Sequence, residues 1–228
     1  MHQRRRNRRE VAVVGYHASM AQAQDPEDAV LLAAWQRGDR AAGQKLFARY
    51  YEPVARFFFN KVGDGGTDLI QRTFLGCLEG LPGFRAEGSF RSYLFAIAYR
   101  QLCRHYRTKR NDRVDLATIS AVALDPSIVG LLTEREETRL FLTGLRELPV
   151  DLQVALELHY WEQCSVAEIA VALEIPEGTV KSRLRRGREC LRAAIERLAT
   201  RADLATSTLQ GMETWARAVR MQAGREPA

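Results

Sequence analysis

The sequence predicts an all-α protein made of two small helical domains joined by a flexible linker, with a helix-turn-helix in the second domain. Apolar residues recur at three- and four-residue spacings through most of the chain, and no β-like alternation occurs in its first half. A segment without periodicity that contains Pro and Gly, residues 111–130, divides the chain. A length of 228 residues with 46% hydrophobic residues is enough for cores of this size.

Residues 1–24 are expected to form a disordered basic arm, and residues 25–112 the first helical domain. Asp25 and Pro26 mark the start of its first helix, because a capping carboxylate followed by proline favours a helix N-terminus. The later helices of this domain are indicated by the same periodicity and lie at about residues 46–50, 54–58, 67–78 and 89–109.

After a linker at residues 113–132, the second domain is expected at residues 133–198. Ser165 and Glu168 have the S-x-x-E spacing of a capping box, which starts a short helix. Pro176 ends the turn that follows and opens a longer, strongly basic helix. Two short helices across such a turn form a helix-turn-helix. Residues 199–228 extend past this domain and are expected to contain an amphipathic helix that packs on it, with binding of a regulator as the alternative.

Charge is segregated along the chain, which has a formal net charge of +6. Residues 85–113 carry eight basic and two acidic residues, and residues 175–197 carry seven and three. Between them, residues 146–174 carry six acidic residues and one basic residue. Two separate contacts with a polyanion would produce this pattern; two helices with solvated charged faces are the alternative.

Several classes of protein are disfavoured. No run approaches the ~18 apolar residues of a membrane-spanning helix, so we expect no membrane insertion. The four cysteines form no CxxC pair, which argues against a zinc or redox site and favours reduced thiols in the cytoplasm. The four histidines form no HxxxH-type pair and no Gly-rich phosphate loop occurs, so an enzyme of nucleic acids has little support. We expect no cofactor and no metal.

The basic helix of the second domain has the features of a DNA-recognition helix. If Val180 and Leu184 face the core, Lys181, Ser182 and Arg185 face outward. Arginine can donate two hydrogen bonds to the O6/N7 edge of guanine, and the helix N-terminus enters the major groove in this motif. Arg183 is better placed for phosphates or for acids on neighbouring helices. A basic amphipathic helix in an ordinary bundle is the alternative.

The long helix of the first domain combines cations with aromatic residues after its cap, Ser89. Cations follow a phosphate backbone and aromatic faces stack on unpaired bases, so the mixture suits single-stranded nucleic acid. Several of its apolar residues are expected in the core; the candidates for stacking are Tyr93, Tyr99 and Tyr106.

Short segments occur in a set order along residues 28–197. They read Arg-Gly-Asp at 37–39, Asp-Leu-Ile-Gln at 68–71 followed by Phe74, Phe-Arg at 84–85, Gly-Ser-Phe-Arg-Ser-Tyr-Leu at 88–94, Ile-Ala at 97–98, and Gly-Thr-Val-Lys-Ser-Arg-Leu at 178–184. In order and separation they resemble the bacterial RNA polymerase sigma factors, specifically the compact extracytoplasmic-function (ECF) group of the sigma-70 family.

The resemblance implies a protein without an active site, whose partners are core RNA polymerase and promoter DNA, with an anti-sigma factor as a further partner common in the family. It assigns core binding and −10 melting to a sigma-2-like first domain, and −35 reading to a sigma-4-like second domain. For core polymerase it implicates Asp68, Leu69, Gln71 and Phe74. For the −10 element it implicates Arg85, Ser89, Arg91, Tyr93, Tyr99, Arg100, Arg104 and Arg107. For the −35 element it implicates Thr179, Lys181, Ser182, Arg183, Arg185 and Arg186.

The chain departs from the family pattern in the first basic helix. The family often has Trp at the position of Tyr93, Asn at that of Arg100 and Asp at that of Arg104, so this helix is more basic here. The alternative function is a helix-turn-helix regulator that binds duplex DNA without joining the polymerase.

Overall fold

The computed structural model describes residues 26–62, 65–84, 88–110, 116, 119 and 136–210. Within these residues it contains nine α-helices, one short 3₁₀ helix and no strand, so the all-α prediction is confirmed. The predicted N-terminal arm, most of the predicted linker, Arg85 and residues 211–228 lie outside the described residues. Among the described helices none is long and apolar enough to cross a membrane.

The first half contains α1 (Pro26–Gln36), α2 (Arg40–Val62), α3 (Gly66–Gly80), the 3₁₀ helix η2 (Leu81–Gly83) and α4 (Phe90–Arg110). Gly38 makes the turn between α1 and α2 with a φ of 98°, a conformation that only glycine adopts at no steric cost. Asp39 then caps α2, because its Oδ1 accepts the backbone N–H groups of Ala41 and Ala42 at 2.9 and 3.1 Å.

The two helices predicted at residues 46–50 and 54–58 are one helix, and that prediction was wrong in this respect. Pro53 lies inside α2. A proline inside a helix removes one backbone hydrogen bond. Burial of apolar residues on both sides of it, among them Leu46 and Phe58, keeps the helix continuous.

The second half contains α6 (Glu136–Glu147), α7 (Val150–Tyr160), α8 (Val166–Leu173), α9 (Glu177–Leu198) and α10 (Ala202–Gln210). The helix-turn-helix prediction is confirmed in α8 and α9, and the capping box of Ser165 and Glu168 is present. Glu174 ends α8 in the left-handed conformation, with a φ of 56°. Helix α10, in the predicted extension, packs on α6 and α9.

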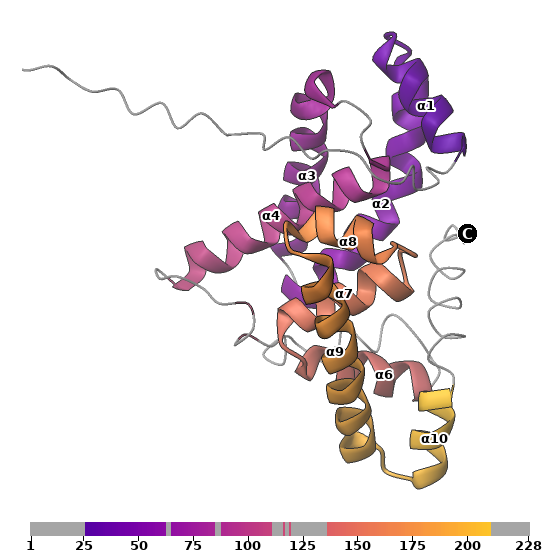
Figure 1. Ribbon diagram of the computed structural model, residues 1–228, viewed down its shortest axis with the longest axis vertical. Helices are drawn as coiled ribbons and strands as arrows, with labels where there is room; N and C mark the ends of the chain where they lie inside the picture. The colour runs from indigo at the N-terminus through magenta and orange to yellow at the C-terminus, as the bar shows by residue number, and fades with distance from the viewer. Residues whose placement is uncertain are drawn as a thin grey trace, which may run out of the picture.

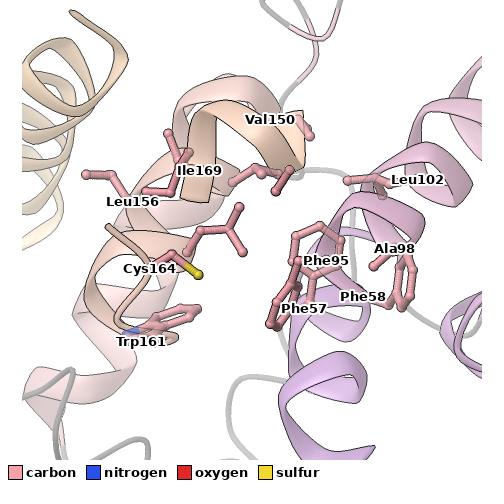
Figure 2. Packing of buried hydrophobic residues seen from close by; sticks show 14 of the residues in the cluster. Phe57, Phe58, Phe95, Ala98, Leu102, Val150, Leu156, Trp161, Cys164 and Ile169 are labelled. Atoms are coloured by element: carbon pink, nitrogen blue, oxygen red, sulfur yellow. The ribbon is translucent and has the colours of Figure 1, made fainter. Parts of the chain in front are cut away.

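The two halves pack against each other, with α4 beside α8 and α2 beside α7 (Figure 1). Their apolar side chains form one continuous cluster, in which Phe57 and Phe95 lie on one side and Cys164 and Ile169 on the other (Figure 2). Helix α7 is buried from Val150 to Leu158 because elements of both halves cover it.

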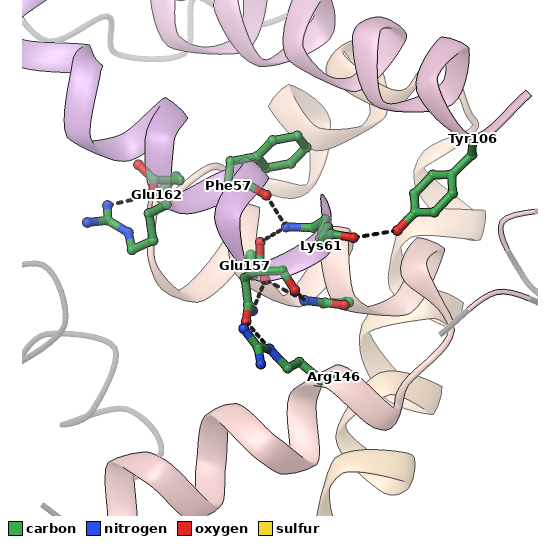
Figure 3. A network of polar contacts seen from close by, with 9 residues as sticks. Phe57, Lys61, Tyr106, Arg146, Glu157 and Glu162 are labelled. Carbon is green, nitrogen blue, oxygen red and sulfur yellow. Dashed lines mark hydrogen bonds and ion pairs between the residues drawn. The ribbon is translucent and has the colours of Figure 1, made fainter. Parts of the chain in front are cut away.

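A buried polar network crosses between the halves (Figure 3). The Lys61 ammonium of α2 pairs with the Glu157 carboxylate of α7, and both side chains are 2% exposed or less. Asn60 donates to the same carboxylate at 2.9 Å, and Gln153 donates to it at 3.0 Å. Burial lowers the pKa of Lys61, and the charge of Glu157 opposes that shift. The network joins α2 to α7 across the contact between the halves.

Candidate nucleic-acid interface

The outward side of α9 is accessible and basic. Lys181, Ser182, Arg185 and Arg186 are exposed, and Thr179 is half-buried near the helix N-terminus. The opposite side of the helix faces the core, where Val180 and Leu184 are buried, so an apolar stripe at helical spacing fixes which side faces solvent. Arg185 pairs with Glu189 one turn later at 3.2 Å. Since both side chains of that pair are exposed, little free energy holds Arg185 away from an incoming base.

Arg183 differs from the other basic residues of the same helix. Its Nε lies 3.2 Å from Asp151 Oδ2 of α7, and its side chain is 22% exposed. Of the two roles expected for Arg183, phosphate contact or pairing with an acid on a neighbouring helix, the structure shows the second. It joins α9 to α7 and stands apart from the outward face.

The N-terminal part of α4 is covered by the second half. Ser89 caps α4 as predicted, since its Oγ accepts the Ser92 N–H at 3.1 Å. The same hydroxyl donates to the Glu168 carboxylate of α8. Arg91 donates to the backbone carbonyl of Glu162 at 3.0 Å. Two residues implicated at the −10 element are thus bonded to the helix-turn-helix half.

The tyrosines of α4 are packed inward. Tyr93 lies against Phe84, with ring centroids 4.6 Å apart, and donates to the Cys77 carbonyl at 3.5 Å. Tyr106 donates to the Lys61 carbonyl at 2.7 Å. Burial raises the pKa of Tyr99 to about 12. All three tyrosines are half-buried, so none offers an open stacking face in this arrangement.

The arginines further along α4 are exposed. Arg104 and Arg107 face solvent, and Arg100 pairs with Glu174 of the helix-turn-helix turn, Nη1 to Oε1 at 2.9 Å. The basic stretch predicted for this helix therefore divides into a part near Ser89 and Arg91 that contacts the second half, and an exposed part that begins at Arg100.

The residues of α3 that are implicated in polymerase binding differ in their exposure to solvent. Asp68 and Gln71 are exposed and Phe74 is half-buried, whereas Leu69 is 3% exposed and belongs to the core. Sequence reasoning missed two neighbours on the exposed side, Leu75 and Leu78, which are 54% and 48% exposed. The signal was available, since both lie within two turns of Gln71 on one side of the helix.

Three acidic residues that contact α4 were also missed as a group: Glu162, Glu168 and Glu174. The sequence marks Glu168 as a capping-box residue and gives no sign of its second contact. Among the described residues no group of three or more His, Cys, Asp or Glu side chains could hold a metal ion.

Two protein-family matches fall one in each half of the chain. Residues 46–112 match the family Sigma-70 region 2, and residues 138–191 match Sigma-70, region 4. The ECF RNA polymerase sigma-E factor of Escherichia coli K12 is 27% identical over 186 residues, which cover 76% of this chain and 97% of that protein. The protein of the same name from Haemophilus influenzae is 28% identical over 183 residues, covering 75% and 96%.

Two solved structures share the fold. CnrH in complex with the cytosolic domain of CnrY matches with a TM-score of 0.56 at 22% identity, over 76% of this chain and 99% of that one. The sigma factor RpoE with the anti-sigma factor NepR, from Bartonella quintana, matches with a TM-score of 0.55 at 20% identity, over 68% and 98%.

The two regional matches together cover more than half of the chain, which belongs to the sigma-70 family of RNA polymerase sigma factors. Within that family its curated relatives place it in the ECF group. The helix-turn-helix regulator outside the polymerase is not favoured.

Proposed function

We propose that this protein binds core RNA polymerase and directs transcription initiation, with α9 reading the −35 element and α4 capturing the melted −10 strand. One observation supports it most: a region 2 match and a region 4 match occur in one chain, and each contains a basic helix. A regulator that only binds duplex DNA would need region 4 alone.

The −35 element is assigned to the outward side of α9. Thr179, Lys181 and Ser182 lie in its first turns, which enter the major groove in helix-turn-helix proteins. Arg185 and Arg186 follow one turn later and are exposed, so their guanidinium groups can reach base edges or phosphates. Arg183 serves this surface by joining α9 to Asp151, and in that role it is a positioning residue.

The −10 strand is assigned to α4 and the loop before it. Arg100, Arg104 and Arg107 provide exposed cations along one helix. Tyr93 and Tyr99 are the candidate rings for unpaired bases, and because both are half-buried their packing has to change before a base can stack on them. Ser89 and Arg91 lie at the start of the helix, and Arg85 precedes it. Stacking contributes about 1–3 kcal/mol per base, enough to help hold a few bases unpaired.

Core polymerase is assigned to α3. Asp68 and Gln71 supply polar contacts, and the exposed Leu75 and Leu78 add apolar area that the sequence prediction lacked. Phe74 is held in place by Phe47, with ring centroids 4.8 Å apart. Exposed leucines rimmed by polar residues are typical of protein–protein contacts. Leu69 would support this surface from the core.

The remaining assignments follow from the same proposal. Residues 25–112 form the sigma-2-like domain and residues 133–198 the sigma-4-like domain. The remaining segments are the arm at 1–24, the linker at 113–132 between the two domains, and the extension at 199–228. The protein acts in the cytoplasm, where the polymerase is, and carries out no catalysis of its own. An anti-sigma factor is a further candidate partner, because one of the similar structures is a complex with such a factor.

Run-off transcription tests the proposal. Purified protein added to core polymerase is expected to start transcripts from a subset of a promoter library. The double variant D68A/Q71A is expected to weaken core binding while leaving duplex binding intact, and Glu196→Gln, on an exposed part of α9, is the control. Intact duplex binding without association with core polymerase at low salt would support the regulator instead.

A further inference from the structure

Asp28, in the first turn of α1, is a buried carboxylate that the proposed function does not use. It is 2% exposed, whereas the neighbouring Glu27 is exposed and pairs with Arg49 at 3.1 Å. The helix dipole favours an acidic residue in the first turn without requiring its burial, and Glu27 is sufficient for that role. Burial of a charge costs free energy unless hydrogen bonds and an opposite charge compensate it. The partners of Asp28 therefore indicate what it does.

Two side chains of α2 bond the two carboxylate oxygens of Asp28. Arg49 Nη1 donates to Oδ1 at 2.9 Å, and the Tyr50 hydroxyl donates to Oδ2. An ionised carboxylate can only accept hydrogen bonds, and a tyrosine hydroxyl has one proton to donate. Because that proton is directed at Asp28, the Tyr50 oxygen can act toward any further neighbour only as an acceptor.

The further neighbour of Tyr50 is Arg91 of α4. Its guanidinium group hydrogen-bonds to the Tyr50 side chain, and although burial raises the pKa of Tyr50, the charge of Arg91 opposes that shift. An arginine carries donors and no acceptor, so it fits the acceptor that the bond to Asp28 leaves on Tyr50. The Tyr50 ring is 3% exposed and packs on Phe90, with ring centroids 5.4 Å apart, which fixes the hydroxyl in place.

The contact with Tyr50 leaves donors of Arg91 for a second acceptor. A guanidinium group has five N–H donors, and Arg91 Nη1 donates to the backbone carbonyl of Glu162, outside the first half, at 3.0 Å. Carbonyl and phosphate oxygens are both hydrogen-bond acceptors, and a phosphate oxygen is the stronger of the two for an arginine. An Arg91 side chain held at Tyr50 can therefore reach an acceptor that does not belong to its own half.

We propose that Asp28 and Tyr50 are positioning residues for Arg91 in binding of the −10 strand: they hold one side of its guanidinium group so that the other side meets an acceptor on the strand. The proposal rests on the assignment of Arg91 to that strand. An arginine loses rotamer freedom when it binds, and a side chain that is already fixed loses less. All three residues lie in the first half, so the positioning does not depend on contacts with the second half.

A double-mutant cycle on strand binding tests the proposal, with anisotropy of a fluorescein-labelled single-stranded oligo(dT) and the full chain at low salt. Tyr50→Phe removes the hydroxyl and keeps the ring, and is expected to weaken binding about two- to tenfold, the effect of ordering one long side chain. Arg91→Ala is expected to weaken it about tenfold or more. The double variant should bind like Arg91→Ala alone, because Tyr50 acts through Arg91.

Asp28→Asn tests the other member of the chain of contacts. An asparagine amide can also donate to the Tyr50 oxygen, which turns the hydroxyl proton toward Arg91. The variant is expected to weaken oligo(dT) binding in the same direction as Tyr50→Phe, and to have no further effect in the Arg91→Ala background. Thermal unfolding followed by circular dichroism verifies that each variant is folded at the assay temperature.

Two controls separate positioning from general support of the core. Tyr51→Phe removes the hydroxyl of the adjacent, exposed tyrosine and should bind like the wild type. Arg107→Ala changes an exposed arginine near the other end of α4, so its fold-loss should multiply with that of Tyr50→Phe. A tyrosine that only supports the core would weaken binding by the same factor in every background.

The outcomes distinguish this proposal from the proposed function. Wild-type affinity of Tyr50→Phe, or the same loss with and without Arg91, would overturn the positioning role and leave the −10 assignment in place. If Arg91→Ala binds oligo(dT) like the wild type, the assignment of Arg91 to the strand fails, and the positioning role fails with it.

Discussion

Helices α4 and α9 are both long, basic and assigned to promoter DNA, yet they differ in what covers them. The outward side of α9 faces solvent, and the ion pair Arg185–Glu189 on it lies within the helix itself. The first turns of α4 face α8, and their donors are bonded to residues about 70 to 80 positions away in the chain. The side chains assigned to duplex binding on α9 are mostly exposed in the arrangement described, whereas Ser89 and Arg91 of α4 would have to leave their partners in the second half before they could contact a strand.

The difference shows that charge density alone does not define a binding surface. Both helices lie in the stretches of positive charge that the sequence marks, and the acidic stretch between them supplies the cover for one of them. Because α8 contacts both α4 and α9, the half that is assigned to duplex DNA also contacts the helix that is assigned to the single strand.

The largest effect is expected from the buried pair that aligns the halves. Lys61→Met leaves the Glu157 carboxylate buried without its cation, which should cost about 3–5 kcal/mol of unfolding free energy. Chemical denaturation followed by circular dichroism measures it. The double variant Lys61→Met/Glu157→Gln removes both charges and should be clearly less destabilised than Lys61→Met. Equal destabilisation of the two variants would mean that packing around Lys61, and not its charge, carries the effect.

A smaller effect is expected at the open surface. Arg185→Ala should weaken binding to a cognate −35 duplex by about 1–3 kcal/mol and relax specificity at one position. Fluorescence anisotropy on a set of single-base variants of the duplex measures both. A uniform loss across all duplexes would make Arg185 a phosphate contact.

The smallest effect is expected for Arg183→Ala, which distinguishes the role of Arg183 from that of Arg185 on the same helix. Arg183→Ala removes the pair with Asp151 and should lower the unfolding free energy by about 1 kcal/mol, without altering base preference in the duplex set. Thermal unfolding and the same anisotropy series measure the two quantities. A change in base preference like that of Arg185→Ala would place Arg183 on the reading surface and contradict its assignment as a positioning residue.

Local pattern predicts most of the fold and the open surface. The spacing of Val180 and Leu184 sets the outward side of α9, and Ser165 with Glu168 marks the start of α8, since both signals lie within a turn or two of one helix. The continuity of α2 through Pro53 was missed because burial by distant segments overrides a local helix-breaking residue.

The covered surface could not be predicted in the same way. Glu174 and Arg100 are 74 residues apart, and Glu168 and Ser89 are 79 apart, so nothing in either neighbourhood indicates the partner. Leu69 shows the same limit, because a leucine at helical spacing can face the core or a partner protein, and here it is 3% exposed. Tertiary contacts decide such cases, and a single sequence does not encode them locally.

Two residues of the predicted linker affect how far the halves can separate. The carbonyls of Ile119 and Leu116 accept the backbone N–H groups of Val150 and Asp151, at 2.8 and 3.4 Å, and so bind the start of α7. While those bonds hold, only the chain between Arg110 and Leu116 connects α4 to the second half, a reach of about 20 Å when fully extended. A promoter whose two elements require a wider span would have to release this anchor. The spacing between the −35 and −10 elements that the protein tolerates would then depend on the stability of these two backbone hydrogen bonds to the first turn of α7.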